Sequence, residues 1–214
     1  LHLNNNNIRR LDPGIFGGLS SLHCLYLQNN QIAFIPRGLF SDLLSVRYLT
    51  LQKNRLSVLG SGTFLGMTSL QTLNLANNKI SRISDSAFYH LENLAYFLSL
   101  SHNPIGSIQP FAFKGLNKLR YLSLKNVKLK CIAVNGFFGL NNLSQLILSY
   151  NDLENINSST FTVLNNLMYL QLDRNKIAKL EPEVLKPLVS LTHLQVNFNP
   201  WNCSCKMLGL LNWL

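Results

Sequence analysis

The stretch LHCLYLQNNQI at residues 22–32 returns as VRYLTLQKNRL at residues 46–56 and as LQTLNLANNKI at residues 70–80. All three share the pattern L-x-x-L-x-L-x-x-N-x-L, with valine or isoleucine in place of some leucines. Its asparagine recurs every 24 residues, with one step of 25 residues between Asn78 and Asn103. The series consists of Asn6, Asn30, Asn54, Asn78, Asn103, Asn151, Asn175 and Asn199, and Val127 is its one exception. A fixed period of this length predicts a solenoid of stacked repeats.

The alternation within each repeat predicts its local structure. In the L-x-L run, apolar and variable residues alternate with a period of two, the pattern of a short strand with one buried face. An asparagine at the turn after each strand can both donate to and accept from the backbone of neighbouring turns. A second apolar column should fill the core between the units, so that each unit contacts only its neighbours. This second column lies ten residues after each position of the asparagine series. It consists of Phe16, Phe40, Phe64, Phe88, Phe113, Phe137, Phe161 and Leu185.

The composition agrees with a repeat protein. The chain of 214 residues contains 45 Leu and 27 Asn, and only 13% of its residues are charged. A hydrophobic share of 47% excludes a disordered chain. No apolar run approaches the roughly 18 residues of a membrane-spanning helix, and no basic start followed by an apolar segment marks a signal peptide. We therefore expect any membrane anchor to lie outside these residues.

The repeat resembles the leucine-rich repeat, in the form of about 24 residues that is found in extracellular proteins. The resemblance covers the whole chain. It implies a curved right-handed horseshoe, with a parallel β-sheet on the concave face and short irregular or 3-10 segments on the convex face. We expect the array to span residues 1–198 in about nine units, of which the first is truncated.

The end of the sequence resembles a different element. The stretch NPWNCSC from Asn199 onward resembles the start of the cysteine-rich cap that closes extracellular leucine-rich repeat arrays. We expect residues 199–214 to form the first half of such a cap, with Trp201 covering the end of the core. In that cap, two later cysteines normally pair with the positions of Cys203 and Cys205. The resemblance implies an extracellular location, either as the ectodomain of a plasma-membrane protein or as a secreted protein.

The sequence contains no catalytic or metal-binding pattern. Cys24 and Cys131 are expected in strands of one ladder roughly 19 Å apart, beyond the ~7 Å limit for bridged Cα atoms. The five histidines fall on different turns, without a carboxylate at a fixed offset. No nucleophile elbow, phosphate-binding loop or paired-carboxylate motif occurs either. We therefore expect no enzymatic activity, no cofactor and no metal, while a role as the regulatory subunit of an enzyme stays open.

The variable strand positions on the concave face are the candidate binding site. Aromatic residues are frequent at these positions, which suits a protein-binding face, and the positions that follow are basic. The candidate ligand-binding residues are Tyr26, Tyr48, Lys53, Arg55, Lys79, Phe97, Tyr121, Lys125, Lys128 and Tyr169. Those from Tyr48 to Lys128 should form one contiguous patch. Two simpler interpretations stay open: the rings can serve only to shield the sheet, and the charges only to keep the protein soluble.

The net charge of +10 favours an acidic partner. An acidic protein ligand fits best, because aromatic anchors alternate with the charges. A polyanion of the heparan sulfate type would use the lysines and arginines without needing the tyrosines. Nucleic acid is not expected, because the cap motif implies an extracellular location. The sequence thus predicts a non-catalytic, protein-binding ectodomain fragment of a receptor-like cell-surface protein, with a secreted matrix or glycosaminoglycan-binding module as the alternative.

Two sequons predict glycosylation, at Asn142 and at Asn157, and Asn202 begins a third formal match inside the expected cap. We expect both glycans to lie away from the concave face. A glycan at either position would then leave the candidate binding site accessible.

Two irregularities carry structural predictions. Val127 should mark a weak point, where backbone groups are left to water or to Asn126. The extra residue before Asn103 should be absorbed as a bulge between Ala95 and Phe97, because a slip in register would expose the leucines that follow. These leucines are Leu98 and Leu100.

Overall fold

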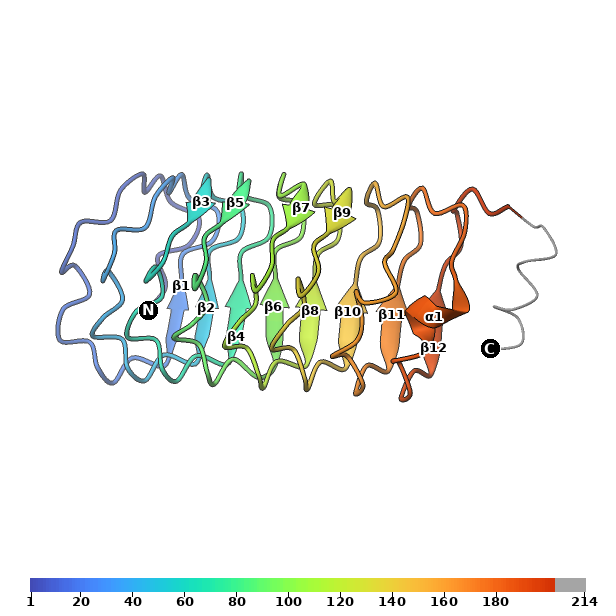
Figure 1. Cartoon of the computed structure of the whole chain (residues 1–214). Coiled ribbons are helices and arrows are strands. Elements are labelled where there is room, and N and C mark those ends of the chain that lie inside the picture. The colour runs from blue at the N-terminus through green and yellow to red at the C-terminus, as the bar shows by residue number, and fades with distance from the viewer. Residues whose placement is uncertain (203–214) are drawn as a thin grey trace.

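From Leu25 onward, the first leucine of each L-x-L run is the centre of a three-residue strand of one parallel sheet. The computed structural model describes residues 1–202. Its main sheet has eight strands in the order β1-β2-β4-β6-β8-β10-β11-β12, so consecutive repeats are neighbours (Figure 1). The strands are β1 (Cys24–Tyr26), β2 (Tyr48–Thr50), β4 (Thr72–Asn74), β6 (Phe97–Ser99), β8 (Tyr121–Ser123), β10 (Gln145–Ile147), β11 (Tyr169–Gln171) and β12 (His193–Gln195).

The register of the main sheet follows from the buried leucine at the centre of each strand. Leu25 pairs with Leu49, and Leu49 pairs with Leu73, and all three are completely buried. A shift of one residue would turn each of these side chains to solvent. The periodic leucines therefore fix both the strands and their alignment.

The opposite wall consists of turns and very short elements. Two small sheets pair β3 (Val58–Leu59) with β5 (Arg82–Ile83) and β7 (Ser107–Ile108) with β9 (Cys131–Ile132). The one α-helix of residues 1–202 is α1 (Pro182–Leu185), with four residues.

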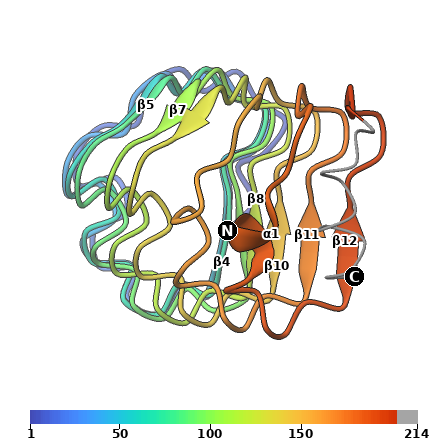
Figure 2. The same cartoon turned by 45° about the vertical axis from the view of Figure 1, so that its right-hand side comes forward.

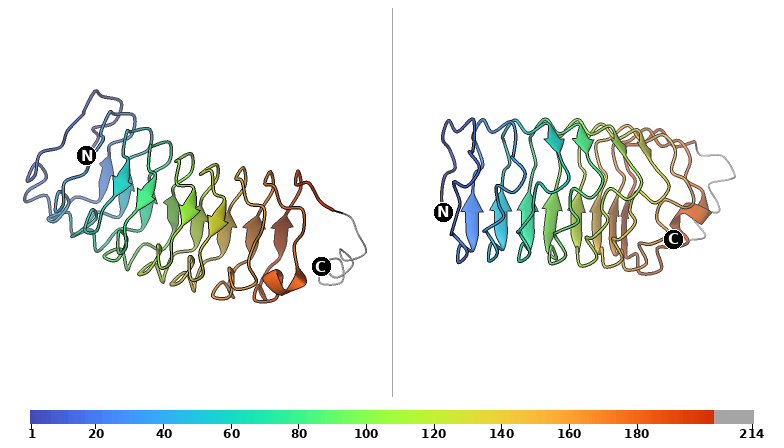
Figure 3. Two further views of the ribbon diagram at one scale, coloured as in Figure 1. Left: turned by 45° about the horizontal axis from the view of Figure 1, so that its top comes forward. Right: turned by 60° about the vertical axis from the view of Figure 1, so that its left-hand side comes forward.

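The remaining convex segments are turns closed by bonds such as that from Gly17 N–H to Gly14 C=O, at 2.8 Å. Figure 2 shows the main sheet on one side of the array and the short elements on the other, and Figure 3 shows that the stack curves along its length. The predicted leucine-rich repeat horseshoe is confirmed.

The two cysteines within residues 1–202 lie on different walls. Cys24 belongs to β1 of the main sheet and Cys131 to β9 of a small sheet, so the prediction that both lie in one ladder of strands was wrong. The reason is that Cys131 follows the strand of its unit and the turn after it. Both are free thiols, as expected. Cys203, Cys205 and most of the predicted cap lie outside the described residues.

The phenylalanine column forms the core. Neighbouring rings from Phe16 to Phe161 are stacked with centroids 6.1 to 6.5 Å apart, and each ring is at most 2% exposed. Leu185 in α1 continues the column and is completely buried. Trp201 packs against this core, and its Nε1 donates to Val196 C=O at 2.8 Å.

The asparagine column links the repeats through backbone groups that the sheet leaves unpaired. Asn54 is typical: its Nδ2 donates to the C=O groups of Leu27 at 2.9 Å and Leu51 at 3.0 Å. Its Oδ1 accepts from Ile32 N–H at 2.9 Å. Because Asn54 is only 7% exposed, these bonds satisfy the polar groups of both the side chain and the turns.

The extra residue before Asn103 is absorbed where the sequence predicts it. Leu98 keeps its pairing with Leu73, and Leu98 and Leu100 are completely buried. The chain bulges at Ala95 and Tyr96, just before β6, and the Tyr96 side chain is 56% exposed. The prediction of a bulge before an unshifted strand is confirmed.

Val127 is accommodated differently from the prediction. Its side chain is completely buried, and its N–H donates to Asn151 Oδ1 at 2.9 Å. In the regular units, Oδ1 of the asparagine column accepts a hydrogen bond from a backbone N–H of the preceding unit. The N–H of Ile105, which an asparagine at position 127 would bind in this way, donates instead to Asn103 C=O at 3.0 Å. Local turn geometry therefore satisfies the Ile105 N–H in place of the missing amide, rather than Asn126.

Candidate functional site

The concave face consists of the outward-facing strand residues of the main sheet together with the turn after each strand. Because the strands are parallel and in register, equivalent residues form straight columns. The first strand residues form the column Cys24, Tyr48, Thr72, Phe97, Tyr121, Gln145, Tyr169 and His193. The third strand residues form the column Tyr26, Thr50, Asn74, Ser99, Ser123, Ile147, Gln171 and Gln195.

The predicted aromatic residues lie on this face in three separate stacks. Ring centroids are 4.4 Å apart for His2–Tyr26, 5.3 Å for Tyr26–Tyr48, 5.0 Å for Phe97–Tyr121 and 4.3 Å for Tyr169–His193. Thr72 and Gln145 separate the stacks, so the rings alone are not continuous along the sheet. The stacking across strands also means that the rings cover the sheet, as the simpler interpretation expects.

Small polar side chains lie beside the rings, in the third strand column and in the turn after β6. Ser101 Oγ lies 2.7 Å from Ser123 Oγ and 3.2 Å from Ser99 Oγ. Thr50 is only 3% exposed, and among residues 1–202 neither its Oγ1 nor Gln28 Oε1 has a hydrogen-bond partner. Such short side chains allow a partner to approach the backbone of the sheet closely.

The predicted basic residues lie after the strands rather than on them. Lys53, Arg55, Lys79 and Lys128 are exposed in the turns, while Lys125 is half-buried. Within the described part of the chain, none of these five cations forms an ion pair. Unneutralised positive charge therefore lines the edge of the face at which the strands end.

One neighbouring cation is neutralised. Lys176 Nζ lies 2.7 Å from Asp152 Oδ1. This hydrogen bond lowers the pKa of the Asp152 carboxyl and raises the pKa of Lys176. The positive charges of Lys130 and Lys128 also help to lower the pKa of Asp152. Asp152 therefore stays ionised at neutral pH.

The sequence analysis missed a cluster on the last units. Lys125 Nζ lies 4.7 Å from the centroid of the Tyr150 ring, and Arg174 Cζ lies 5.0 Å from the same centroid. Arg174 Cζ also lies 4.1 Å from the centroid of the Phe198 ring. The signal was present, because Tyr150, Arg174 and Phe198 replace asparagine at the position before the ladder amide in three successive units. Only Lys125 was among the candidate residues.

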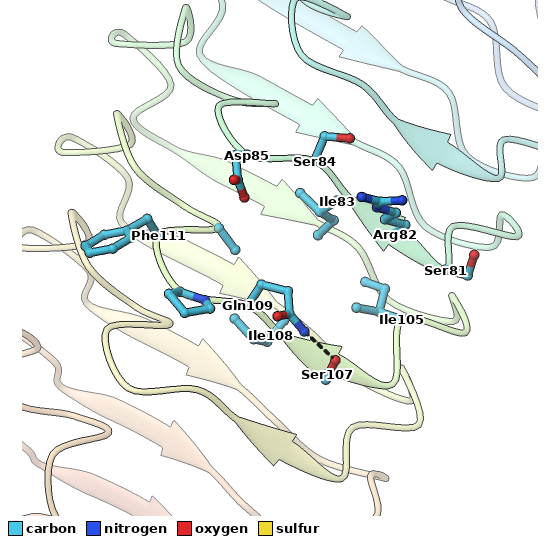
Figure 4. Close-up of a pocket in the computed structure, with 12 residues that line it drawn as sticks. Ser81, Arg82, Ile83, Ser84, Asp85, Ile105, Ser107, Ile108, Gln109 and Phe111 are labelled. Carbon is cyan, nitrogen blue, oxygen red and sulfur yellow. Dashed lines mark hydrogen bonds between the residues drawn. The ribbon is translucent and has the colours of Figure 1, made fainter.

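A hollow of about 970 Å³ lies on the opposite wall, between β5 and β7 (Figure 4). Ile83, Ile105 and Ile108 line it together with Arg82 and Asp85. No hydrogen bond joins β5 to β7 within the described residues, so the second wall is interrupted there.

Pro104 explains part of this interruption. Lys79, at the equivalent position one repeat earlier, donates its N–H to Leu56 C=O at 2.9 Å, and proline lacks that donor. Among the described residues that line the hollow, Arg82 and Asp85 are the charged ones. The described residues contain no group of three histidine, cysteine or acidic side chains that could hold a metal ion. None of their helices is long and apolar enough to span a bilayer.

The asparagines of both complete sequons are exposed. Asn142 donates from Nδ2 to Asn117 C=O at 2.7 Å, and Asn157 Oδ1 accepts from Ser159 N–H at 2.9 Å. Neither residue belongs to the concave face. Asn202 is exposed, but its sequon extends beyond the described residues.

Comparison with known proteins identifies the repeat. The family model described as leucine rich repeat matches residues 1–56, 45–105, 95–153 and 141–200. A leucine-rich repeat protein of Leptospira interrogans is 25% identical with a TM-score of 0.80, over 100% of this chain and 58% of that one. A TLR13–ssRNA13 complex is 26% identical with a TM-score of 0.73, over 90% of this chain and 35% of that one. The chain therefore spans little more than half of the first protein and about a third of the second. None of the curated proteins compared with the sequence matches it.

Proposed function

Because the chain belongs to the leucine-rich repeat family, we propose that it is the protein-binding ectodomain fragment of a receptor-like cell-surface protein. It binds an acidic protein on its concave face and catalyses no reaction. The observation that carries this proposal is the combination, on one face, of aromatic stacks with cations that have no acidic partner among residues 1–202. Aromatic side chains act as anchors in protein interfaces, and complementary charge accelerates the encounter.

The location and domain division are part of the same proposal. Residues 1–198 form the binding array, and residues 199–214 begin a cap of the kind found in extracellular proteins. The packing of Trp201 against the core supports this role for the start of the cap. Glycans at Asn142 and Asn157 fit a cell-surface or secreted protein and leave the concave face open, because both side chains are exposed and lie outside it.

A secreted matrix module that binds a sulfated glycosaminoglycan is the second candidate. Lys53, Arg55 and Lys79 favour it, since they place exposed positive charge in successive units. Single-stranded RNA is a third type of ligand to be tested, because one similar structure is a complex with RNA. We rank it below an acidic protein for the reason of location given above.

The test is binding of the 214-residue chain to three immobilised probes: purified acidic cell-surface proteins, heparin and single-stranded RNA. We expect saturable binding to at least one protein that persists at physiological salt. Retention on heparin alone, lost steeply as salt rises, would select the matrix module instead. Saturable binding to RNA alone would contradict both candidates.

A further inference from the structure

Nine equivalent residues, each directly before a member of the asparagine column or before Val127, share an unusual backbone conformation. All have a positive φ, between 53° and 60°, and they are Asn5, Asn29, Lys53, Asn77, His102, Asn126, Tyr150, Arg174 and Phe198. Asparagine tolerates this left-handed region better than other residues with a side chain, and four of the nine are asparagine. The last three units instead carry Tyr150, Arg174 and Phe198, although such residues cost free energy there. Strain at one exposed position in successive units points to a role outside the backbone.

Those side chains form an alternating cluster with Lys125, which we call the Arg174 cluster. Arg174 lies between two rings, with Cζ at 5.0 Å from the Tyr150 centroid and at 4.1 Å from the Phe198 centroid. A guanidinium that stacks on rings through its flat face keeps the N–H groups at its edge available. The rings themselves remain accessible, with Tyr150 45% and Phe198 66% exposed. Arg174 is itself exposed, so the cluster presents a cation flanked by two accessible rings to solvent.

Neither cation of the cluster is neutralised within residues 1–202. The ion pairs there are Arg10–Asp12, Lys176–Asp152 and Lys179–Glu181. Asp173 precedes Arg174 in the chain, but its Oδ1 accepts a hydrogen bond from Ser149 Oγ. Lys125 and Arg174 both lie over the ring of Tyr150. The planar fork of the Arg174 guanidinium matches the geometry of a carboxylate, and Lys125 adds a second positive charge to the cluster.

We propose that Arg174, positioned by the rings of Tyr150 and Phe198, forms a subsite for a carboxylate side chain of an acidic protein ligand, to which Lys125 adds positive charge. This inference deepens the proposed function and rests on it, since it names the anion subsite of the same face. Single-stranded nucleic acid would need open ring faces on which bases can stack. Here Arg174 covers one face of each ring and Lys125 lies over Tyr150 as well, which reduces the ring surface on which a base could stack. A carboxylate needs only the edge of the guanidinium.

The test measures binding of the full chain to a short glutamate-rich peptide and to the same peptide with glutamine in place of glutamate. We expect Arg174→Gln to weaken binding of the glutamate peptide on the order of tenfold. Arg174→Lys should recover only part of this loss, because lysine keeps the charge but lacks the planar fork. The matched control is Arg82→Gln on the opposite wall, which removes the same charge and should leave affinity unchanged. Thermal unfolding of each variant shows that the fold is intact.

The outcomes separate the subsite from the function. Equal effects of Arg174→Gln and Arg82→Gln would overturn the subsite and indicate a diffuse effect of net charge. If Arg55→Gln weakens binding and Arg174→Gln does not, the acidic ligand binds elsewhere on the concave face, and only the subsite is rejected. No preference of the unaltered chain for the glutamate peptide over its glutamine counterpart would overturn both proposals. If Arg174→Gln reduces binding of single-stranded RNA more than that of the peptide, the assignment to a carboxylate is wrong.

Discussion

Asn151 Oδ1 accepts hydrogen bonds from the backbone N–H groups of both Val127, at 2.9 Å, and Leu129, at 3.0 Å. Asn54 shows the usual arrangement, in which the ladder amide accepts from one backbone N–H. Asn151 therefore accepts one more hydrogen bond from the preceding unit than Asn54 does. The side chain of Asn151 thus links the unit that contains Val127 to the next unit.

The two hydrogen bonds that Asn151 accepts predict that replacing different asparagines of the column lowers the free energy of unfolding by different amounts. Asn151→Val should lower the free energy of unfolding by about 1 to 3 kcal/mol more than Asn54→Val, because it leaves an additional buried N–H without a partner. Valine is the matched replacement, since Val127 shows that it fits the column. Denaturant unfolding of both variants measures the difference, and equal midpoints with equal slopes would contradict the prediction.

Restoring the amide should strengthen the irregular unit. The C=O group of Leu51 accepts two hydrogen bonds from side chains of the asparagine column, whereas those of Leu100 and Leu124 accept only one each. An asparagine at position 127 can donate the second bond to both. We expect Val127→Asn to raise the free energy of unfolding on the order of 1 kcal/mol. A lower denaturation midpoint would mean that the local bond from Ile105 N–H to Asn103 C=O already meets the need and that the loss of buried valine dominates.

The bulge before β6 predicts that substitutions at two nearby residues change the free energy of unfolding by very different amounts. Leu98→Ala should lower the free energy of unfolding by about 2 to 5 kcal/mol, because a completely buried side chain leaves a cavity. Tyr96→Ala should change it by no more than about 0.5 kcal/mol, since this side chain is 56% exposed. Thermal unfolding of the two variants gives the comparison, and a large effect of Tyr96→Ala would show that the bulge is stabilised by its own side chain.

Binding kinetics should separate anchors from steering charges on the concave face. With the protein ligand found in the binding test, Tyr121→Ala should mainly accelerate dissociation, because a stacked ring is lost from the contact. Lys79→Glu should slow association and flatten its dependence on salt. Lys114→Glu, on the outer arc, changes the net charge equally and is the control. If that control weakens binding as much as Lys79→Glu, the assignment to the concave face fails.

The ion pair between Lys176 and Asp152 predicts a titration that NMR can follow. Since the hydrogen bond from Lys176 lowers the pKa of Asp152, Lys176→Gln should raise the pKa of this carboxyl toward its ordinary value. A folded-state pKa below the unfolded one stabilises the fold above the unfolded pKa, and this contribution is lost as the pH falls through the folded pKa. The effect on stability should be small, because the pair is exposed and screened by solvent. An unchanged pKa in Lys176→Gln would assign the shift to Lys130 and Lys128.

The sequence by itself determined the strands, the ladder and the core. A leucine at a fixed period places its side chain at the same point of every turn, so Leu25, Asn54 and Phe64 take positions that their spacing alone specifies. The same logic located the bulge before Leu98, because burial of that side chain outweighs any gain from keeping the period. Periodic burial is local information, and each unit repeats it.

Only the tertiary structure decided what the variable side chains do together. That Arg174 lies between the rings of Tyr150 and Phe198 depends on side-chain conformations in units 24 residues apart, which no spacing specifies. The division of the aromatic residues into three stacks likewise depends on which neighbour each ring contacts. The sequence repeats the scaffold in every unit, whereas contacts on the exposed face depend on differences between units, and these act only after the units are stacked.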